Sequence, residues 1–183
     1  MRELALNILD IVMNSIEAKA TRVIIFVEEF NSQNLLRVRI KDNGRGMGET
    51  FIKSVLDPFV TTRTTRSVGM GLSMFRQIAR QCGGELTIES EIGKGTLVTT
   101  TFQLNNLNLP PIGQVADSVV NLYIGSIDVH FCYVHKTDHG VFSFDSYWML
   151  VYMAQQDCQL YEAVGPAKAY IKQKLKTIKS KAM

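Results

Sequence analysis

An α+β fold, a two-layer sandwich in which helices cover a sheet, is what this 183-residue sequence predicts for its larger part. Twice within residues 1–106 an amphipathic helical pattern is followed by two strand patterns, as expected when helices pack on a sheet. Pro110-Pro111 then marks a boundary, and the patterns beyond it are those of a helix, a hairpin and further helices. We therefore expect one domain over residues 1–106 and a small α+β module over residues 107–183.

The composition is that of an ordinary globular protein. Hydrophobic residues make up 46% and charged residues 20% of the chain, which excludes wholesale disorder and collagen. The net charge of +3 argues against a nucleic-acid binder. Cys82, Cys132 and Cys158 form no CxxC pair, which argues against a disulfide framework or a thiolate zinc site. No export signal or membrane-length apolar stretch is present in the sequence, so we expect a cytoplasmic protein without a membrane span.

The first element is a helix over residues 2–19 with an unusual distribution of polar side chains. Apolar residues such as Leu6, Leu9, Met13 and Ile16 recur at helical spacing and, with other aliphatic residues, cover most of the circumference. One polar stripe remains, formed by Glu3, Asn7, Asp10, Asn14 and Glu17. Such a stripe is typical of a helix that lines a wet cavity, and the alternative is a stripe that faces solvent.

Two strands follow, since residues 23–28 are rich in β-branched and aromatic side chains and residues 36–41 alternate between apolar and basic. The turn-like segment 31–34 makes them a hairpin. The remaining elements of this domain are a glycine-rich loop (42–48), a short helical stretch to residue 56, a polar segment, a helix (72–82) ended by Gly83-Gly84, and strands over 85–91 and 96–104.

The second module is predicted as a helix (113–124), strands over 127–136 and 141–145, and one or two helices that Gly165-Pro166 would separate. We interpret His130, His135 and His139 as strand and turn residues rather than a phosphorelay or metal site. The apolar stripe over residues 147–152 is interpreted as core, formed by Tyr147, Trp148, Leu150, Val151 and Tyr152.

The basic end is predicted as an amphipathic helix in which Lys168, Lys172, Lys176 and Lys179 lie opposite aliphatic residues. It could bind acidic lipid, nucleic acid or a partner. We favour the alternative that its apolar face packs on the domain while its lysines face water, because that face is small for a membrane-surface helix.

The sequence contains none of the common phosphate-binding motifs. The sequence has no GxxxxGK[ST] loop, and the segment that begins at Gly69 has Met74 in place of the third small residue of a Rossmann fingerprint and follows no strand. The kinase motifs HRD and DFG are also missing.

A different set of residues predicts a nucleotide site. Asp10 and Asn14 lie four residues apart on one helical face, where an amide oxygen could ligate magnesium and a carboxylate could act as general base. Asp42 precedes Gly44 and Gly46, which would let backbone approach a flat ligand closely. Gly69 and Gly71 lie just before a helix, so free amides could face phosphates. Arg63 and Arg66 stand among four threonines and could supply phosphate contacts, on a segment that we expect to be mobile.

In this order the motifs resemble those of one superfamily. DIVMN, DNGRGM, DPFVTTR, VGMGLS and GKGT are similar to the N, G1, lid, G2 and terminal boxes of the GHKL ATPases, which share the Bergerat ATP-binding fold, a mixed sheet covered by helices. The superfamily comprises gyrase, heat-shock chaperone, histidine-kinase and MutL ATPases. Residues 57–104 resemble histidine-kinase catalytic domains most, whereas residues 13–25 look more like the MutL and topoisomerase branch.

The resemblance implies ATP and Mg²⁺ as cofactors and gives a role to each matching position. Asp42 would accept a hydrogen bond from the adenine amino group, partly through a water that Thr96 also holds. Asn14 would ligate Mg²⁺, and Asp10 would be the general base. The other cofactor-binding positions implied are Gly44, Gly46, Met47, Thr62, Arg63, Gly69, Met70, Gly71 and Leu72.

Three departures from the family pattern bear on activity. Asp10 is one methylene shorter than the usual Glu, Arg63 replaces the usual Lys, and we expect no phosphoacceptor helix ahead of the helix over residues 2–19. We expect a signalling protein that hydrolyses ATP or transfers its γ-phosphate to an unidentified partner protein. The alternative is a non-catalytic switch whose partner binding depends on bound ATP or ADP, and a homodimer stays open for either.

Overall fold

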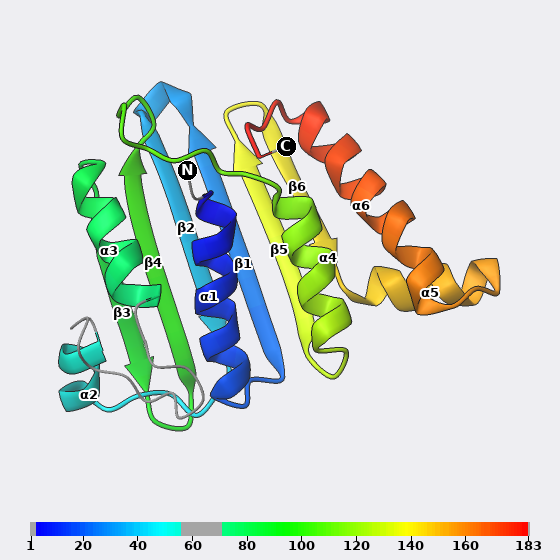
Figure 1. The fold of residues 1–183 in the computed structure, drawn as a ribbon, viewed down its shortest axis with the longest axis horizontal. Helices are drawn as coiled ribbons and strands as arrows, with labels where there is room; N and C mark the ends of the chain where they lie inside the picture. Colours follow the sequence, from blue (N-terminus) through cyan, green and yellow to red (C-terminus); the bar gives the residue numbers. More distant parts are fainter. Residues whose placement is uncertain (1–2, 56–70, 183) are drawn as a thin grey trace.

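The computed structural model describes residues 3–55 and 71–182, which form one six-stranded sheet with helices on one face (Figure 1). The strand order is β3-β4-β2-β1-β5-β6. The strands are β1 (Arg22–Phe30), β2 (Leu35–Asp42), β3 (Leu86–Glu91), β4 (Gly95–Gln103), β5 (His130–Thr137) and β6 (Gly140–Asp145). The helices are α1 (Leu4–Glu17), α2 (Glu49–Val55), α3 (Gly71–Gln81), α4 (Val115–Gly125), α5 (Tyr147–Gln156) and α6 (Leu160–Thr177), with a short 3-10 turn at Asn31–Gln33. The predicted α+β class with two layers is confirmed.

The predicted β1–β2 hairpin is present and antiparallel, with Val23 opposite Asp42. Every second side chain of β1 and of β2 is buried beneath the helices, from Val23 to Glu29 and from Leu36 to Asp42. Because successive side chains of a strand point to opposite faces, this alternation makes Asp42 the last helix-facing residue of β2.

Helix α1 crosses the middle of the sheet between α3 and α4 (Figure 1). Its core contacts come from Leu4, Ile8, Ile11 and Val12, which are at most 3% exposed. In the predicted apolar row, Leu6 and Met13 are largely exposed, because α1 is covered by the sheet below and by a helix on each side but not above.

The second half of the chain extends the same sheet. β5 pairs in parallel with the free edge of β1, and β6 pairs antiparallel with β5. An uncovered edge would expose unpaired backbone N–H and C=O groups. Pairing with β5 satisfies these groups along the edge of β1 that the hairpin leaves open. The division of the chain at residues 106 and 107 stays a proposal, while the hydrogen-bonded sheet runs across it.

The segment around Pro111 is bound to the start of α1. The amides of Leu4 and Ala5 donate to the carbonyls of Pro111 and Ile112, and the Glu3 carboxylate accepts from the amide of Gln114. These bonds satisfy N–H groups that the first turn of a helix leaves without partners.

The predicted helix break at Gly165-Pro166 is wrong, since α6 continues through Pro166. Proline in a helix interior removes one backbone hydrogen bond and costs about 3 kcal/mol. On both sides of Pro166 the same face of α6 is fully buried, by Ala163, Ala167, Ile171 and Leu175, and this burial offsets the cost.

The predicted packing of the apolar face of the basic helix is confirmed, whereas two of its lysines bind a carboxylate and Lys179 lies beyond the end of α6. Ile171, Leu175 and Ile178 are buried, and Lys168 and Lys172 pair with Asp117 of α4 at 3.3 and 2.8 Å.

The core interpretation of residues 147–152 is wrong in part. Tyr147, Leu150 and Val151 are 57%, 47% and 53% exposed. Helix α5 lies beyond the sheet and packs on α6, so it buries only one side (Figure 1). Trp148 is on that side and stacks on Tyr152 and Tyr170.

Candidate functional site

A cavity of about 490 Å³ lies among α1, the end of β2, the loop after it, α2, the start of α3 and the β3–β4 turn. This volume falls within the roughly 300–1,000 Å³ of small-molecule sites. Its lining residues are Ile11, Asn14, Ser15, Glu17, Ala18, Asp42, Arg45, Gly46, Met47, Gly48, Phe51, Val55, Gly71, Leu72, Ile92, Thr96 and Val98. Most of them are apolar, so the few polar groups decide which ligand is accepted.

The carboxylate of Asp42 is the most constrained polar group of the cavity. Asp42 is only 8% exposed, and its Oδ2 accepts a 2.7 Å hydrogen bond from the Ser15 hydroxyl. Oδ1 accepts from the Gly44 amide at 2.9 Å. A carboxylate offers about four acceptor positions, so these two bonds fix its orientation and leave capacity for a ligand that donates.

Strand pairing places a second polar group beside this carboxylate. Thr96 of β4 lies directly opposite Asp42 and, on its other side, opposite Ser90 of β3. The Ser90 hydroxyl donates to the Gly95 carbonyl at 2.8 Å and accepts from the Met47 amide at 2.9 Å. Thr96 Oγ1 lies 2.9 Å from Ser90 Oγ, so the hydroxyl pair ties the loop after β2 to the β3–β4 hairpin.

Glycine is required at two positions of the loop after β2, of which Gly46 lines the cavity and Gly44 does not. A Cβ on Gly44 would lie 2.9 Å from the Ala18 carbonyl oxygen. Gly46 has a φ of +67°, and a Cβ there would lie 1.9 Å from the Glu91 carbonyl oxygen. The loop therefore lies directly against α1 and the β3–β4 turn, with backbone in contact with backbone.

The polar stripe of α1 is divided between two roles. Asn14 and Glu17 line the cavity, whereas Glu3 binds the segment after Pro111 and the buried Asn7 hydrogen-bonds to the Glu3 carbonyl. The helix therefore lines a cavity with the last part of its stripe.

Asp10 lies near the cavity but does not line it. Its side chain is exposed, and its Cβ is 3.2 Å from where a Cβ on Gly71 would be. Gly71 and Leu72 begin α3, and both line the cavity. Thr62, Arg63, Gly69 and Met70 lie outside the described residues.

Sequence reasoning missed Ser15 and Ser90 as positioning residues. Ser15 lies on the buried side of α1, and a hydroxyl among aliphatic side chains needs a hydrogen-bond partner. That requirement pointed to a nearby acceptor. Ser90 gave no comparable indication, since its role depends on strand register.

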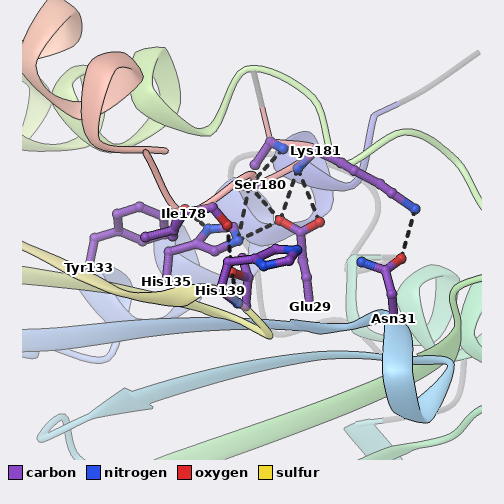
Figure 2. A network of polar contacts seen from close by, with 10 residues as sticks. Glu29, Asn31, Tyr133, His135, His139, Ile178, Ser180 and Lys181 are labelled. Carbon is purple, nitrogen blue, oxygen red and sulfur yellow. Dashed lines mark hydrogen bonds and ion pairs between the residues drawn. The ribbon is translucent and has the colours of Figure 1, made fainter. Parts of the chain in front are cut away.

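A second polar cluster lies at the other end of the sheet (Figure 2). The buried Glu29 carboxylate accepts from His135 Nε2 at 2.6 Å and from the Ser180 hydroxyl at 2.5 Å, and it also accepts from the Lys181 amide. The Tyr133 hydroxyl hydrogen-bonds to Nδ1 of His135. Burial alone would raise the pKa of Glu29, but the bonds from His135, Ser180 and Lys181 outweigh it and lower the pKa. His130 and His135 are strand residues and His139 is in the turn, as predicted.

Among the helices of residues 3–55 and 71–182, none is both long enough and apolar enough to cross a membrane.

Comparison with known proteins identifies the cavity-bearing part of the chain. The family described as histidine kinase-, DNA gyrase B-, and HSP90-like ATPase matches residues 1–106. Sporulation kinase C of Bacillus subtilis is 30% identical over 98 residues, which are 54% of this chain and 23% of that protein. Sensor histidine kinase ZraS of Escherichia coli is 26% identical over 106 residues, 58% of this chain and 23% of that one.

One solved structure agrees on the fold. The N-terminal domain of a DNA repair protein aligns with a TM-score of 0.54 at 16% identity, over 79% of this chain and 52% of that chain. The chain spans less than a quarter of the length of the two kinases. Because the family match covers more than half of the sequence and includes the Asp42 loop and Thr96, the chain belongs to the histidine kinase-, DNA gyrase B- and HSP90-like ATPase family.

Proposed function

We propose that the chain binds ATP with Mg²⁺ in the cavity beside Asp42, and that it hydrolyses the nucleotide or transfers its γ-phosphate to a partner protein. The observation that carries the proposal is a buried, oriented carboxylate in a largely apolar cavity. Such a carboxylate accepts hydrogen bonds, and the amino group of adenine donates them. Membership of the family and the kinases among its relatives support the same ligand.

The residues present fit an adenine ring. The Asp42 carboxylate would accept from the amino group, with Thr96 holding a water between them. Met47 and Leu72 would form apolar walls, and Gly46 and Gly71 line the cavity without a side chain. Gly44 does not line it, but the absence of a Cβ there lets the loop pack on Ala18.

The residues present also fit a magnesium–phosphate group. Mg²⁺ prefers oxygen ligands and keeps several waters, so one amide oxygen and the nucleotide phosphates suffice to hold it. Asn14 lines the cavity and would supply the amide oxygen. When bound, the ion would neutralise charge on the phosphates. Thr62 and Arg63 are proposed as phosphate contacts, and Gly69 and Met70 as further nucleotide-binding residues, from the sequence pattern alone.

The chemical step needs a group that orients the attacking oxygen, and Asp10 is the proposed general base. Asp10 lies one helical turn from Asn14, beside Gly71. Its oxygen would accept the proton of a water or of an acceptor hydroxyl as the new oxygen–phosphorus bond forms at the γ-phosphate and the bond from that phosphorus to the departing ADP breaks.

The position of Asp10 outside the cavity lining favours a second candidate function. In that candidate the chain binds nucleotide without turnover, and occupancy of the site alters binding of a partner. The cytoplasm as location, the partner and a homodimer are proposals that rest on the sequence.

Nucleotide titration calorimetry tests the binding proposal. Replacement of Asp42 by Asn should weaken Mg-ATP binding roughly 10- to 150-fold, because a hydrogen bond to a charged group contributes about 1.5–3 kcal/mol. Asp128→Asn is the matched control, since Asp128 is exposed and outside the cavity. Equal affinity of the Asp42→Asn and unmodified chains would contradict the adenine assignment.

Phosphate release distinguishes the two functions. If Asp10 is the base, Asp10→Ala keeps its ATP affinity and loses turnover. If neither the unmodified chain nor the variant releases or transfers phosphate in the presence of its partner, the switch function replaces the enzymatic one.

A further inference from the structure

A cluster of three potential metal ligands lies on the sheet face opposite the helices. His130 and Cys132 are two residues apart in β5, so their side chains point to the same face. Phe131 and Tyr133, which alternate with them, are buried under the helices. Asp145 ends β6 and is the direct pairing partner of Cys132. Strand register therefore brings an imidazole, a thiol and a carboxylate together.

The distances among the three donor atoms match those around one metal ion. His130 Nε2 lies 2.9 Å from both oxygens of Asp145, Cys132 Sγ lies 3.3 Å from Oδ2, and Sγ lies 3.6 Å from Nε2. Zinc bonds of roughly 2.0–2.1 Å to nitrogen or oxygen and 2.3 Å to sulfur place tetrahedral ligand atoms roughly 3.3–3.6 Å apart. Shifts of a few tenths of an ångström would therefore bring all three atoms into one coordination sphere.

Neighbouring contacts hold each ligand in place. The Tyr147 amide donates to Asp145 Oδ1 at 2.9 Å, and the Tyr147 ring stacks on the His130 ring with centroids 4.4 Å apart. The Ser146 amide donates to the Phe131 carbonyl at 2.8 Å, and the Phe131 amide donates to the Ser146 hydroxyl at 3.1 Å. These two hydrogen bonds fix the end of the hairpin. The cluster is thus preorganised, which reduces the cost of ordering ligands when an ion binds.

The charges of the cluster favour a divalent cation. Asp145 supplies a carboxylate, and the Cys132 thiol donates a hydrogen bond to its Oδ2 at 3.3 Å. A dication bound between the two groups would favour the thiolate form of Cys132, because a thiol that ligates a metal loses its proton.

We propose that His130 Nε2, Cys132 Sγ and an Asp145 carboxylate oxygen form a zinc site, with water in the fourth position. Binding exchanges the thiol proton for the metal, so that a sulfur–zinc bond forms and one proton is released to solvent. The His130 and Asp145 side chains are 22% and 48% exposed, so an ion can enter from solvent and water can complete the tetrahedron.

The donor set selects the class of metal. Thiolate and imidazole suit Zn²⁺, whereas Mg²⁺ and Ca²⁺ prefer oxygen ligands. This site is separate from the proposed magnesium at Asn14, because Asn14 belongs to a helix on the other face of the sheet (Figure 1). The sequence pattern did not predict this zinc site, because the third ligand comes from a paired strand and no CxxC spacing is involved.

Metal titration of the chelator-treated chain without an affinity tag and without nucleotide tests the proposal. Zn²⁺ should bind with one equivalent in calorimetry. Co²⁺ should give tetrahedral visible bands and a near-ultraviolet sulfur-to-cobalt charge-transfer band. Cys132→Ser should remove that band. It should also weaken Zn²⁺ binding by at least roughly 10- to 100-fold, because loss of a residue that only supports a metal ligand already has an effect of that size.

Cys158→Ser is the matched control, because Cys158 is a free, half-buried cysteine outside the cluster. It should leave the cobalt spectrum and the zinc affinity unchanged. Asp145→Asn keeps the side-chain shape and serves as a second test if circular dichroism shows that Cys132→Ser does not fold. A cobalt spectrum without the charge-transfer band, or zinc affinity equal in the unmodified chain and the folded ligand variants, would overturn the proposal.

Discussion

Asp42 and Glu29 are two buried carboxylates on neighbouring strands, under the same layer of helices, and each accepts a hydrogen bond from a serine. They lie at opposite ends of the β1–β2 hairpin. Asp42 accepts two hydrogen bonds from the described part of the chain and lines a cavity. Glu29 accepts from His135, Ser180 and the Lys181 amide, and it lines no wall of that cavity.

The difference separates a binding residue from a structural one. Burial of a carboxylate is unfavourable unless hydrogen bonds or opposite charges compensate it. At Glu29 the protein supplies the compensation, and the residues after α6 are thereby bound to β1 (Figure 2). At Asp42 the compensation from protein is partial, and the remaining acceptor capacity is beside a space that a ligand can fill. The acceptor capacity that remains, together with an adjoining cavity, therefore indicates function better than burial does.

The largest expected effect is on stability, from Glu29→Ala. Removing the Glu29 carboxylate leaves the buried side chains of His135 and Ser180 without their hydrogen-bond acceptor. The free energy of unfolding should therefore fall by about 3–5 kcal/mol. Urea denaturation measures it. Glu28→Ala is the matched control, because Glu28 is on the opposite face and pairs with Arg37 and Arg39 at 3.4 and 3.3 Å, so its loss should cost at most about 1 kcal/mol. Equal losses of stability for the two variants would mean that the Glu29 cluster stabilises the fold no more than a surface ion pair does.

Acid should weaken the Glu29 cluster next. The pKa of Glu29 is lowered on folding from 4.5, so its stabilising contribution is complete above that value and is lost as the pH falls through the folded pKa. The stability difference between the unmodified chain and Glu29→Gln, measured by urea denaturation, should therefore shrink as the pH is lowered from 7 to 3. A difference that grows with acid would mean that Glu29 is protonated in the folded chain.

A smaller effect is expected at the cavity from Ser15→Ala. Loss of the 2.7 Å bond to Asp42 removes a group that orients the carboxylate. We expect ATP binding to weaken roughly 2- to 13-fold, which corresponds to about 0.5–1.5 kcal/mol. Calorimetry measures the affinity, and Ser118→Ala, a change of a buried serine in α4, should leave it unaltered. Tighter binding by Ser15→Ala would show that the serine competes with the ligand.

The smallest expected effect is that of Asp42→Asn on stability in the absence of nucleotide. An amide keeps an acceptor for Ser15 or Gly44, and water can reach the cavity, so the change should stay within about 1 kcal/mol in urea denaturation. A loss as large as that of Glu29→Ala would mean that Asp42 is mainly structural.

Much of the site was predictable because its chemistry follows local motifs. Asp42 with its two glycines, and Asn14 on the polar stripe, could be found from the order and spacing of the motifs, and Asp42, Gly46 and Asn14 line the cavity. Asp10 could be placed on the same helix but not relative to the cavity, since that depends on where α3 begins beside it. The role of Glu29, which lies just beyond the strand predicted over residues 23–28, could not be predicted, because its partners are 106 and 151 positions away.

The sequence alone determined most of the elements and, for residues 36–41, which side of the strand is buried, because periodicity of side chains is a local property of the chain. Only the tertiary structure decided that β5 joins the edge of β1, that α6 continues through Pro166, and that Asp145 meets Cys132. Each of these depends on pairing or burial between distant segments. Local preferences do not encode such contacts, and the gain from satisfying a sheet edge or burying a helix face exceeds the local cost.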